Sequence, residues 1–139
     1  MNKLLNIAVG CLLMAACNSS TSLFQQAKWA QAQGNLPKAL NLYNKLIRQN
    51  PDHAAAFTNR GLVWEMMPAK DDAEKAKHKR YAEQDYLRAL ELNAEQVETY
   101  NNLGALYIDQ KRNGDAVMYL SEAIARNPHY FRALLNRAN

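Results

Sequence analysis

The chain has 139 residues, of which 48% are hydrophobic and 22% are charged, a balance typical of a globular domain and not of a disordered or fibrous protein. Its 17 lysines and arginines outnumber its 13 acidic residues, for a formal net charge of +4. These charges are spread along the sequence without a dense basic stripe, so nucleic acid is not an expected partner.

Residues 1–16 have the features of an export signal. Lys3 supplies a positive charge, residues 4–14 are mostly apolar, and the small residues Ala15 and Ala16 precede Cys17. The apolar run of about eleven residues is shorter than the roughly twenty that a transmembrane helix needs. We therefore expect this segment to be a removed signal peptide and not a membrane span.

The sequence Met-Ala-Ala-Cys at residues 14–17 resembles the lipobox of bacterial lipoproteins. The resemblance implies that Cys17 is lipidated, with palmitate among its acyl chains, and that residues 17–22 form a short polar linker. Cys11, preceded by Val9 and Gly10, is a second candidate box with a shorter apolar run. Ordinary secretion with cleavage near Ala16 is a third interpretation, and all three export the protein.

Cys17 is the single cysteine left after removal of residues 1–16, so an internal disulfide is excluded. One cysteine and three scattered histidines also fail to form the usual zinc or redox motifs, and no metal or cofactor is expected.

An internal repeat organises the rest of the chain, and its clearest copy covers residues 97–130. Small and large apolar residues recur there at fixed positions: Tyr100, Leu103, Gly104, Tyr107, Ala116, Leu120, Ala123 and Pro128. This pattern and its period of about 34 residues resemble the tetratricopeptide repeat (TPR). The resemblance implies an all-α solenoid of helix-turn-helix repeats.

Two weaker copies precede it, at residues 20–53 and 54–96, so that the first copy overlaps the end of the linker. Equivalent positions in these copies hold Ala27, Ala39, Tyr43 and Pro51, then Phe57, Gly61, Trp64, Ala82 and Tyr86. Residues 131–139 match the opening of a fourth repeat or a truncated capping helix.

Apolar stripes with helical spacing support the same assignment without reference to a family. They comprise Ala39, Leu40, Tyr43, Leu46 and Ile47 in the first copy, and Ala116, Val117, Leu120, Ala123 and Ile124 in the third. Small residues such as Gly61 and Gly104 are expected where paired helices cross, with aromatic residues such as Tyr86 and Tyr107 beside them.

The middle copy is nine residues longer than the others, because Gly61 and Gly104 are separated by 43 residues whereas Ala27 and Gly61 are separated by 34. The extra residues lie between Trp64 and Ala82. Pro68 is expected to follow the end of one helix, and Asp71 or Asp72 to cap the next. The mildly basic insertion is either a projecting contact surface or a solvated extension.

The concave face of such a solenoid is the usual peptide-binding surface of the family. The repeat frame places there Phe24, Lys28, Thr58, Asn59, Leu62, Asn101, Asn102, Ala105 and Asp109. The equivalent residues Asn59, Asn102 and Asn136 are the best candidates, because an amide both donates and accepts hydrogen bonds. Packing is the alternative role for these asparagines.

Some family members clamp a partner's terminal carboxylate with lysine, asparagine and arginine side chains. The corresponding positions here hold Phe24, Lys28, Asn59, Glu98 and Asn102, of which Asn59 alone matches outright. Since Glu98 would repel a carboxylate, binding of that kind is disfavoured.

Motifs of catalysis and nucleotide binding are missing from the sequence, and His53, His78 and His129 are expected in turns or in a solvated charged run. We therefore expect a scaffold for protein or peptide partners, without enzymatic activity or a small-molecule substrate. Its architecture resembles outer-membrane adaptor and pilus-assembly lipoproteins that face the periplasm. A structural spacer in a larger envelope complex is the alternative.

Overall fold

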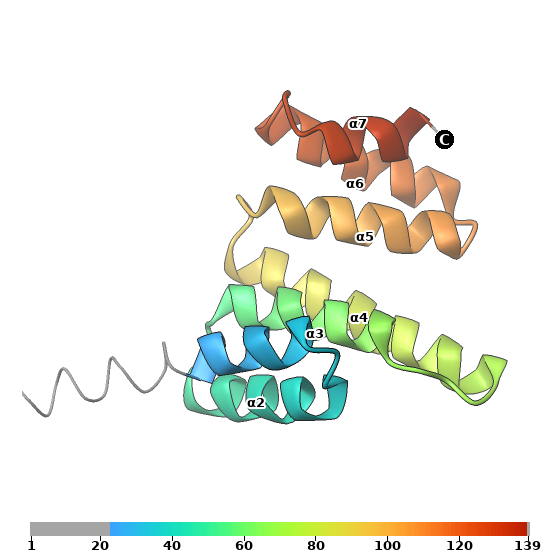
Figure 1. Ribbon diagram of the computed structural model, residues 1–139. Helices are drawn as coiled ribbons and strands as arrows, with labels where there is room; N and C mark the ends of the chain where they lie inside the picture. The colour runs from blue at the N-terminus through green and yellow to red at the C-terminus, as the bar shows by residue number, and fades with distance from the viewer. Residues whose placement is uncertain (1–22, 139) are drawn as a thin grey trace, which may run out of the picture.

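The computed structural model describes residues 23–138, and the predicted signal peptide, lipidation site and linker at residues 1–22 lie outside them. The described part of the chain holds seven helices and no strand, which confirms the all-α prediction. The helices lie side by side in successive antiparallel pairs (Figure 1). They are a first helix at residues 23–32, α2 (Leu36–Gln49), α3 (Ala54–Met66), α4 (Asp72–Leu92), α5 (Val97–Asp109), α6 (Asn113–Arg126) and α7 (Phe131–Ala138).

Local sequence signals account for the first turn and for α2. Gly34 adopts a φ of 73°, a left-handed conformation that glycine accepts without steric cost. The Asn35 side chain then caps α2 by accepting a hydrogen bond from the backbone N–H of Lys38 at 3.3 Å. The buried face of α2 contains the predicted residues Ala39, Tyr43 and Leu46.

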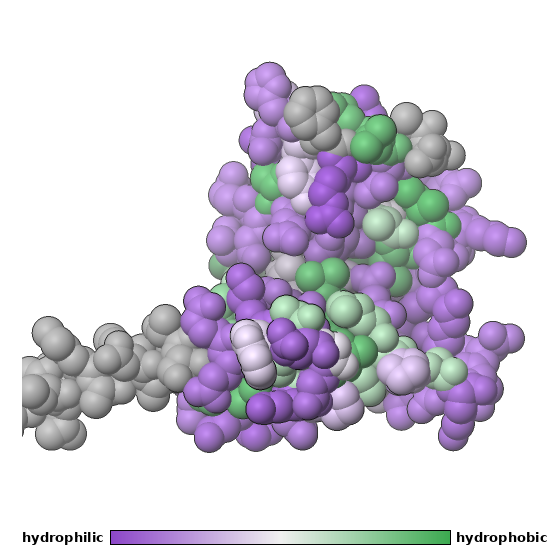
Figure 2. Space-filling view, viewed as in Figure 1, coloured by the Kyte–Doolittle hydropathy of each residue, from purple (hydrophilic) through white to green (hydrophobic). Residues whose placement is uncertain are grey.

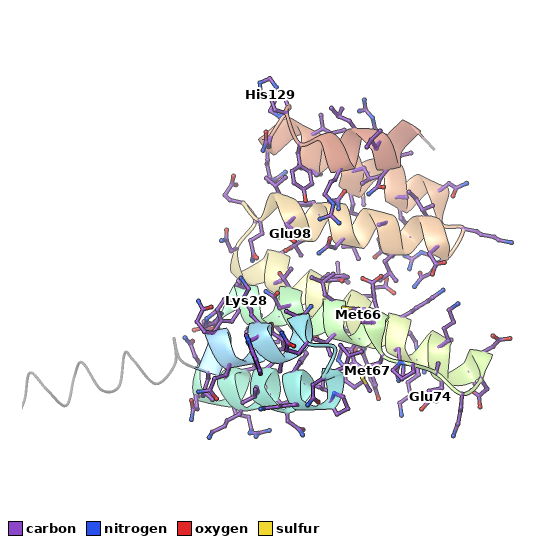
Figure 3. The ribbon with its side chains drawn as sticks, in the orientation of Figure 1. Lys28, Met66, Met67, Glu74, Glu98 and His129 are labelled. Atoms are coloured by element: carbon purple, nitrogen blue, oxygen red, sulfur yellow. The ribbon has the colours of Figure 1, made fainter. Side chains whose placement is uncertain are left out.

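The insertion lies where the sequence predicted it, between α3 and the regular part of α4. Met67, in an extended conformation before Pro68, ends α3. Asp71 begins α4 by accepting a hydrogen bond from the Glu74 N–H at 2.7 Å. The insertion therefore consists of a short loop and extra N-terminal turns of α4, which run past the end of α3 (Figure 1). Glu74 lies near the tip of this projection (Figure 3).

Glycines permit the close helix crossings within the second and third repeats. A Cβ atom on Gly61 would lie 2.6 Å from Cε1 of Tyr86, and one on Gly104 would lie 2.6 Å from Cγ of Leu120. Both partner side chains are fully or almost fully buried. The predicted roles of these glycines and of Tyr86 are confirmed.

One residue of the predicted apolar stripes is misplaced. Val117 is 52% exposed, although its neighbour Ala116 is buried. Successive residues of a helix are rotated by about 100° around its axis, and this rotation carries Val117 off the face that packs on α5.

The surface in Figure 2 is largely hydrophilic, with small hydrophobic patches, one of them over α7. Within residues 23–138 no helix has the length and hydrophobicity to cross a bilayer.

Candidate functional site

A groove of about 460 Å³ lies where the first helices of successive repeats, α3, α5 and α7, face the same side. Its lining combines apolar, amide and charged side chains: Leu62, Glu65, Asn101, Asn102, Ala105, Arg132, Leu135 and Asn136. Four of these, Leu62, Asn101, Asn102 and Ala105, are among the residues that the repeat frame placed on the concave face. The groove therefore has the composition of a surface for an extended peptide, with few charges and several amides.

The asparagines of this surface differ in their hydrogen bonds. Asn136 donates to Oδ1 of Asn101 at 2.9 Å and so ties α7 to α5. Asn59 donates to the carbonyl of Ala55, in its own helix, at 2.8 Å. Asn102 lines the groove, but the residue is only 7% exposed. Its Nδ2 atom is buried and has no hydrogen-bond partner. Asn102 is thus the groove asparagine with an unsatisfied donor.

Other predicted residues lie outside the groove. Thr58 is 4% exposed and its hydroxyl lies 2.7 Å from that of Thr99, inside the α3–α5 contact, so its predicted place on an open surface is wrong. One of the two hydroxyls donates to the other, and the second donates to Oε1 of Gln96, which lies 3.2 Å from Thr58 and 3.4 Å from Thr99. In this buried contact the polar side chains form hydrogen bonds with one another. The repeat pattern alone does not reveal this.

Three further predicted residues also lie away from the groove. The Phe24 ring packs 4.9 Å from the ring of His53, and Lys28 lies exposed 5.8 Å from the Phe24 ring. Asp109, near the other end of α5, forms an ion pair with Lys79 of α4. The predicted set is therefore divided between the groove, the contacts between helices and the surface of other repeats.

Glu65, Arg132 and Leu135 line the groove but were missed as site residues. Arg132 and Leu135 follow Glu98 and Asn101 by one repeat period, so extending the repeat frame into residues 131–139 would have found them. Glu65 follows Leu62 by one helical turn and therefore shares its face. Burial raises the pKa of Glu65, and repulsion from Asp109 adds to the rise, while a hydrogen bond from Tyr86 and the charge of Lys79 oppose it.

The expectation for the histidines was partly wrong. His53 lies in a turn as predicted, where its Nδ1 accepts a hydrogen bond from the Ala56 N–H at 3.2 Å and caps α3. His129 also lies in a turn, at the tip of the loop before α7 (Figure 3). His78 is 8% exposed, because the indole of Trp64 packs 5.6 Å from its ring and shields it from solvent.

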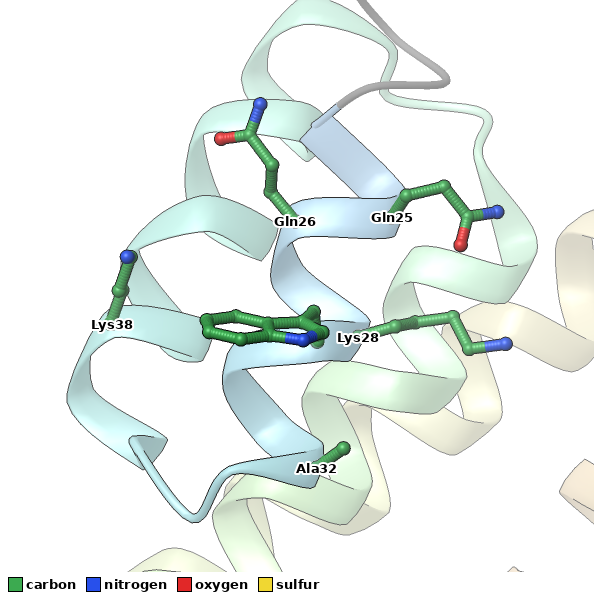
Figure 4. Close-up of a pocket in the computed structure, with 6 residues that line it drawn as sticks. Gln25, Gln26, Lys28, Ala32 and Lys38 are labelled. Carbon is green, nitrogen blue, oxygen red and sulfur yellow. The ribbon is translucent and has the colours of Figure 1, made fainter.

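A shallow hollow also lies on the outer side of the first helix, where Trp29 is 63% exposed (Figure 4). Lys28, Lys38 and neighbouring glutamines surround it. In the described part of the chain, no group of histidine, cysteine and carboxylate residues is arranged to hold a metal ion.

Comparisons with known sequences identify the repeats. Residues 24–85 and 97–130 match two family models, both described as tetratricopeptide repeat, which together cover more than half of the chain. The chain is 30% identical over 107 residues to human Protein O-mannosyl-transferase TMTC3 and 33% identical over 85 residues to human Tetratricopeptide repeat protein 6. These alignments cover 76% and 61% of this chain but only 11% and 15% of the two human proteins.

Solved structures share the fold at low sequence identity. The first TPR of Spaghetti (RPAP3) bound to the HSP90 peptide SRMEEVD matches with a TM-score of 0.74 at 20% identity, over 86% of this chain and 87% of that one. The Arabidopsis OM64 TPR domain matches with a TM-score of 0.75 at 20% identity, over 87% and 93%. MamA matches with a TM-score of 0.74 at 21% identity, over 92% and 70%.

This fold is typically a non-enzymatic scaffold that mediates contacts between proteins, and the HSP90 peptide complex shows such a domain holding a peptide. With the stacked helix pairs, the glycines at their crossings and both family models in agreement, the chain belongs to the tetratricopeptide-repeat family.

Proposed function

We propose that the chain is a non-enzymatic scaffold that binds an extended segment of a partner protein in the groove of α3, α5 and α7. The observation that carries this proposal is the buried, unpartnered Nδ2 of Asn102. A buried donor without a partner costs about 1–3 kcal/mol. A backbone carbonyl of a bound segment would accept its hydrogen bond, while apolar side chains of that segment pack on Leu62 and Leu135.

We further propose that this scaffold is a lipoprotein anchored through Cys17 and recruits its partners in the periplasm, at the inner face of the outer membrane. The support is the lipobox-like sequence at residues 14–17 and the apolar segment before it. Envelope assembly, pilus or secretin biogenesis and the docking of hydrolases are roles that such an adaptor fills.

Site-specific photo-crosslinking in intact envelopes tests the groove. A photoreactive amino acid at Ala105, in the groove, should capture a discrete partner, whereas the same group at Met118, which is 52% exposed on α6, should not. Asn102→Ala should weaken capture about tenfold, which corresponds to ~1.4 kcal/mol. Asn59→Ala is the matched control, because that amide already bonds its own helix.

Two outcomes would contradict the groove proposal. Equal capture from both positions would mean that the groove has no special affinity for a partner. Capture that persists in the Asn102→Ala variant, within a complex that purifies only as a whole, would favour a structural spacer without an independent ligand.

A further inference from the structure

The insertion in the second repeat builds a hollow of about 320 Å³ that adjoins the groove. Its walls come from three elements: Met67 and the loop after α3, His78 and Lys79 of α4, and Asp109 of α5. Glu65 lines both this hollow and the groove. A side chain of a segment bound in the groove could therefore enter the hollow beside Glu65.

His78 offers an unsatisfied hydrogen-bonding atom at this hollow. The residue is 8% exposed, and its Nδ1 is buried with no hydrogen-bond partner in the described part of the chain. When the ring is protonated at Nε2, Nδ1 is an acceptor. A donor from a ligand that displaces the groups covering this nitrogen would satisfy it.

The carboxylate of Glu65 is a second acceptor in need of partners. The hydroxyl of Tyr86 donates to it, yet an ionised carboxylate can accept about four hydrogen bonds in water. Desolvation and the charge of Asp109 raise the pKa of Glu65, while the hydrogen bond from Tyr86 and the charge of Lys79 lower it. The residue is nevertheless exposed where the hollow and the groove meet, so a positive group from a ligand can reach its carboxylate and pair with it.

The hollow is lined by two carboxylates and two lysines, of which Asp109 and Lys79 are paired with each other. Of the other two charges, Glu65 lines both the hollow and the groove, whereas Lys75 is exposed on the α4 extension. A cation that enters from the groove therefore meets the carboxylate of Glu65, which forms no ion pair in the described part of the chain. The described side chains do not form a metal-ligand cluster, so an organic cation fits this acceptor set better than a metal ion.

We propose that the hollow receives a basic side chain, arginine or lysine, from the segment bound in the groove, with Glu65 as its ion-pair partner and Nδ1 of His78 as a hydrogen-bond acceptor. This inference rests on the peptide-binding function proposed above and names the chemistry of the partner. The insertion supplies His78 and the loop wall, so this specificity belongs to the extended second repeat and not to a repeat of regular length.

Selection from a phage-displayed library of random nonapeptides provides the probe. The peptides that bind the wild-type protein should share a basic residue at one fixed position. Selection against Glu65→Gln should lose the preference at that position and keep those at the others. Glutamine retains an acceptor for Tyr86, and Glu91→Gln is the matched control, because it removes a carboxylate from an exposed site elsewhere on α4.

Titration of one selected peptide then measures the contact directly. Replacing its basic residue by citrulline, which is neutral but close in shape to arginine, should weaken binding to the wild type at least about tenfold and to Glu65→Gln less than about twofold. His78→Phe, which keeps a ring against Trp64, should weaken binding of the basic peptide severalfold. The NMR signals of the His78 ring should shift with the basic peptide and not with the citrulline peptide.

The outcomes separate this inference from the function on which it rests. If no selected peptide depends on Asn102, the groove proposal itself fails. If the peptides depend on Asn102 but carry no basic residue, carry an acidic one at that position, or bind equally well with citrulline, the groove stands and the assignment of the hollow is overturned. Circular dichroism of each variant checks that folding is retained.

Discussion

Gly104 of α5 lies directly against Leu120 of α6, so close that a Cβ atom would stand 2.6 Å from Cγ and 2.7 Å from Cδ2 of the leucine. Leu120 is only 1% exposed, and the backbone oxygen of Ala116 lies 3.4 Å from the same point. A side chain at position 104 would therefore force Leu120 to move. The distance between these two helices is therefore set by the missing side chain.

Gly104→Leu is expected to destabilise the fold by more than the roughly 1–3 kcal/mol typical of overpacking, because the first added atom already overlaps Leu120. Thermal unfolding followed by circular dichroism measures the effect. Gly114→Ala is the control, since nothing lies within 4 Å of its Cβ position. It should be neutral or stabilising by up to about 1 kcal/mol. Equal melting temperatures for the two variants would show that the repeat frame is misplaced.

Arg60 joins three helices, and its loss should be costly. Its guanidinium donates to both carboxylate oxygens of Asp85 on α4, at 2.8 and 2.6 Å, and to Oδ1 of Asn44 on α2 at 2.8 Å. The Asp85 side chain is 7% exposed, so removing its partner leaves a buried, uncompensated charge. Arg60→Met should destabilise by about 3 kcal/mol in urea unfolding.

A double variant that removes both charges distinguishes this buried pair from a surface ion pair. The double variant Arg60→Met with Asp85→Leu should recover much of the stability that Arg60→Met loses, because it leaves neither partner unpaired. A loss equal to the sum of the two single losses would contradict coupling between the residues.

The stability of the protein should fall as pH rises through the acidic range, in part because of Glu65. Burial raises the pKa of this carboxyl above its usual value of 4.5, so the folded state holds the proton to a higher pH than the unfolded state. Between these two pKa values the folded state binds more protons, and its stability decreases with increasing pH. Glu65→Gln should reduce this slope and be at least as stable as the wild type near neutral pH.

Urea unfolding at several pH values above about 4 measures the two slopes. Glu91→Gln should leave the wild-type slope unchanged, because that side chain is 65% exposed. If the Glu65→Gln variant keeps the full wild-type slope of unfolding free energy against pH, other groups cause the pH dependence. One of these is Asp85, whose pKa burial raises and Arg60 lowers.

Cys17→Ser should release the protein from the membrane if Cys17 is the lipidated residue. Each buried methylene of an acyl chain contributes about 0.8 kcal/mol, so several chains together anchor a protein almost permanently. Labelled palmitate and fractionation of the envelope provide the measurement. Cys11→Ser is the control and should remain anchored and labelled. Release by Cys11→Ser in place of Cys17→Ser would move the lipidation site, and absence of label in the wild type would contradict lipidation.

The sequence by itself determined the helices, their pairing and the place of the insertion. These features depend on local chemistry: the spacing of Ala39, Tyr43 and Leu46, the cap at Asp71 and the glycines at the crossings all act within one repeat or between its two helices. Because every copy has the same local pattern, the residue positions assigned in one repeat could be assigned in the next as well.

Only the tertiary structure decided which polar groups are free to bind. Thr58 finds its partner in Thr99 of the next repeat, whereas the donor of Asn102 and the buried nitrogen of His78 find none. Some side chains find their hydrogen-bond partner 35 positions away, as Asn136 and Asn101 do, and helical periodicity carries no information about such contacts. The repeat pattern therefore places a side chain on a face of its helix, but contacts between repeats decide whether that side chain is a structural residue or a binding site.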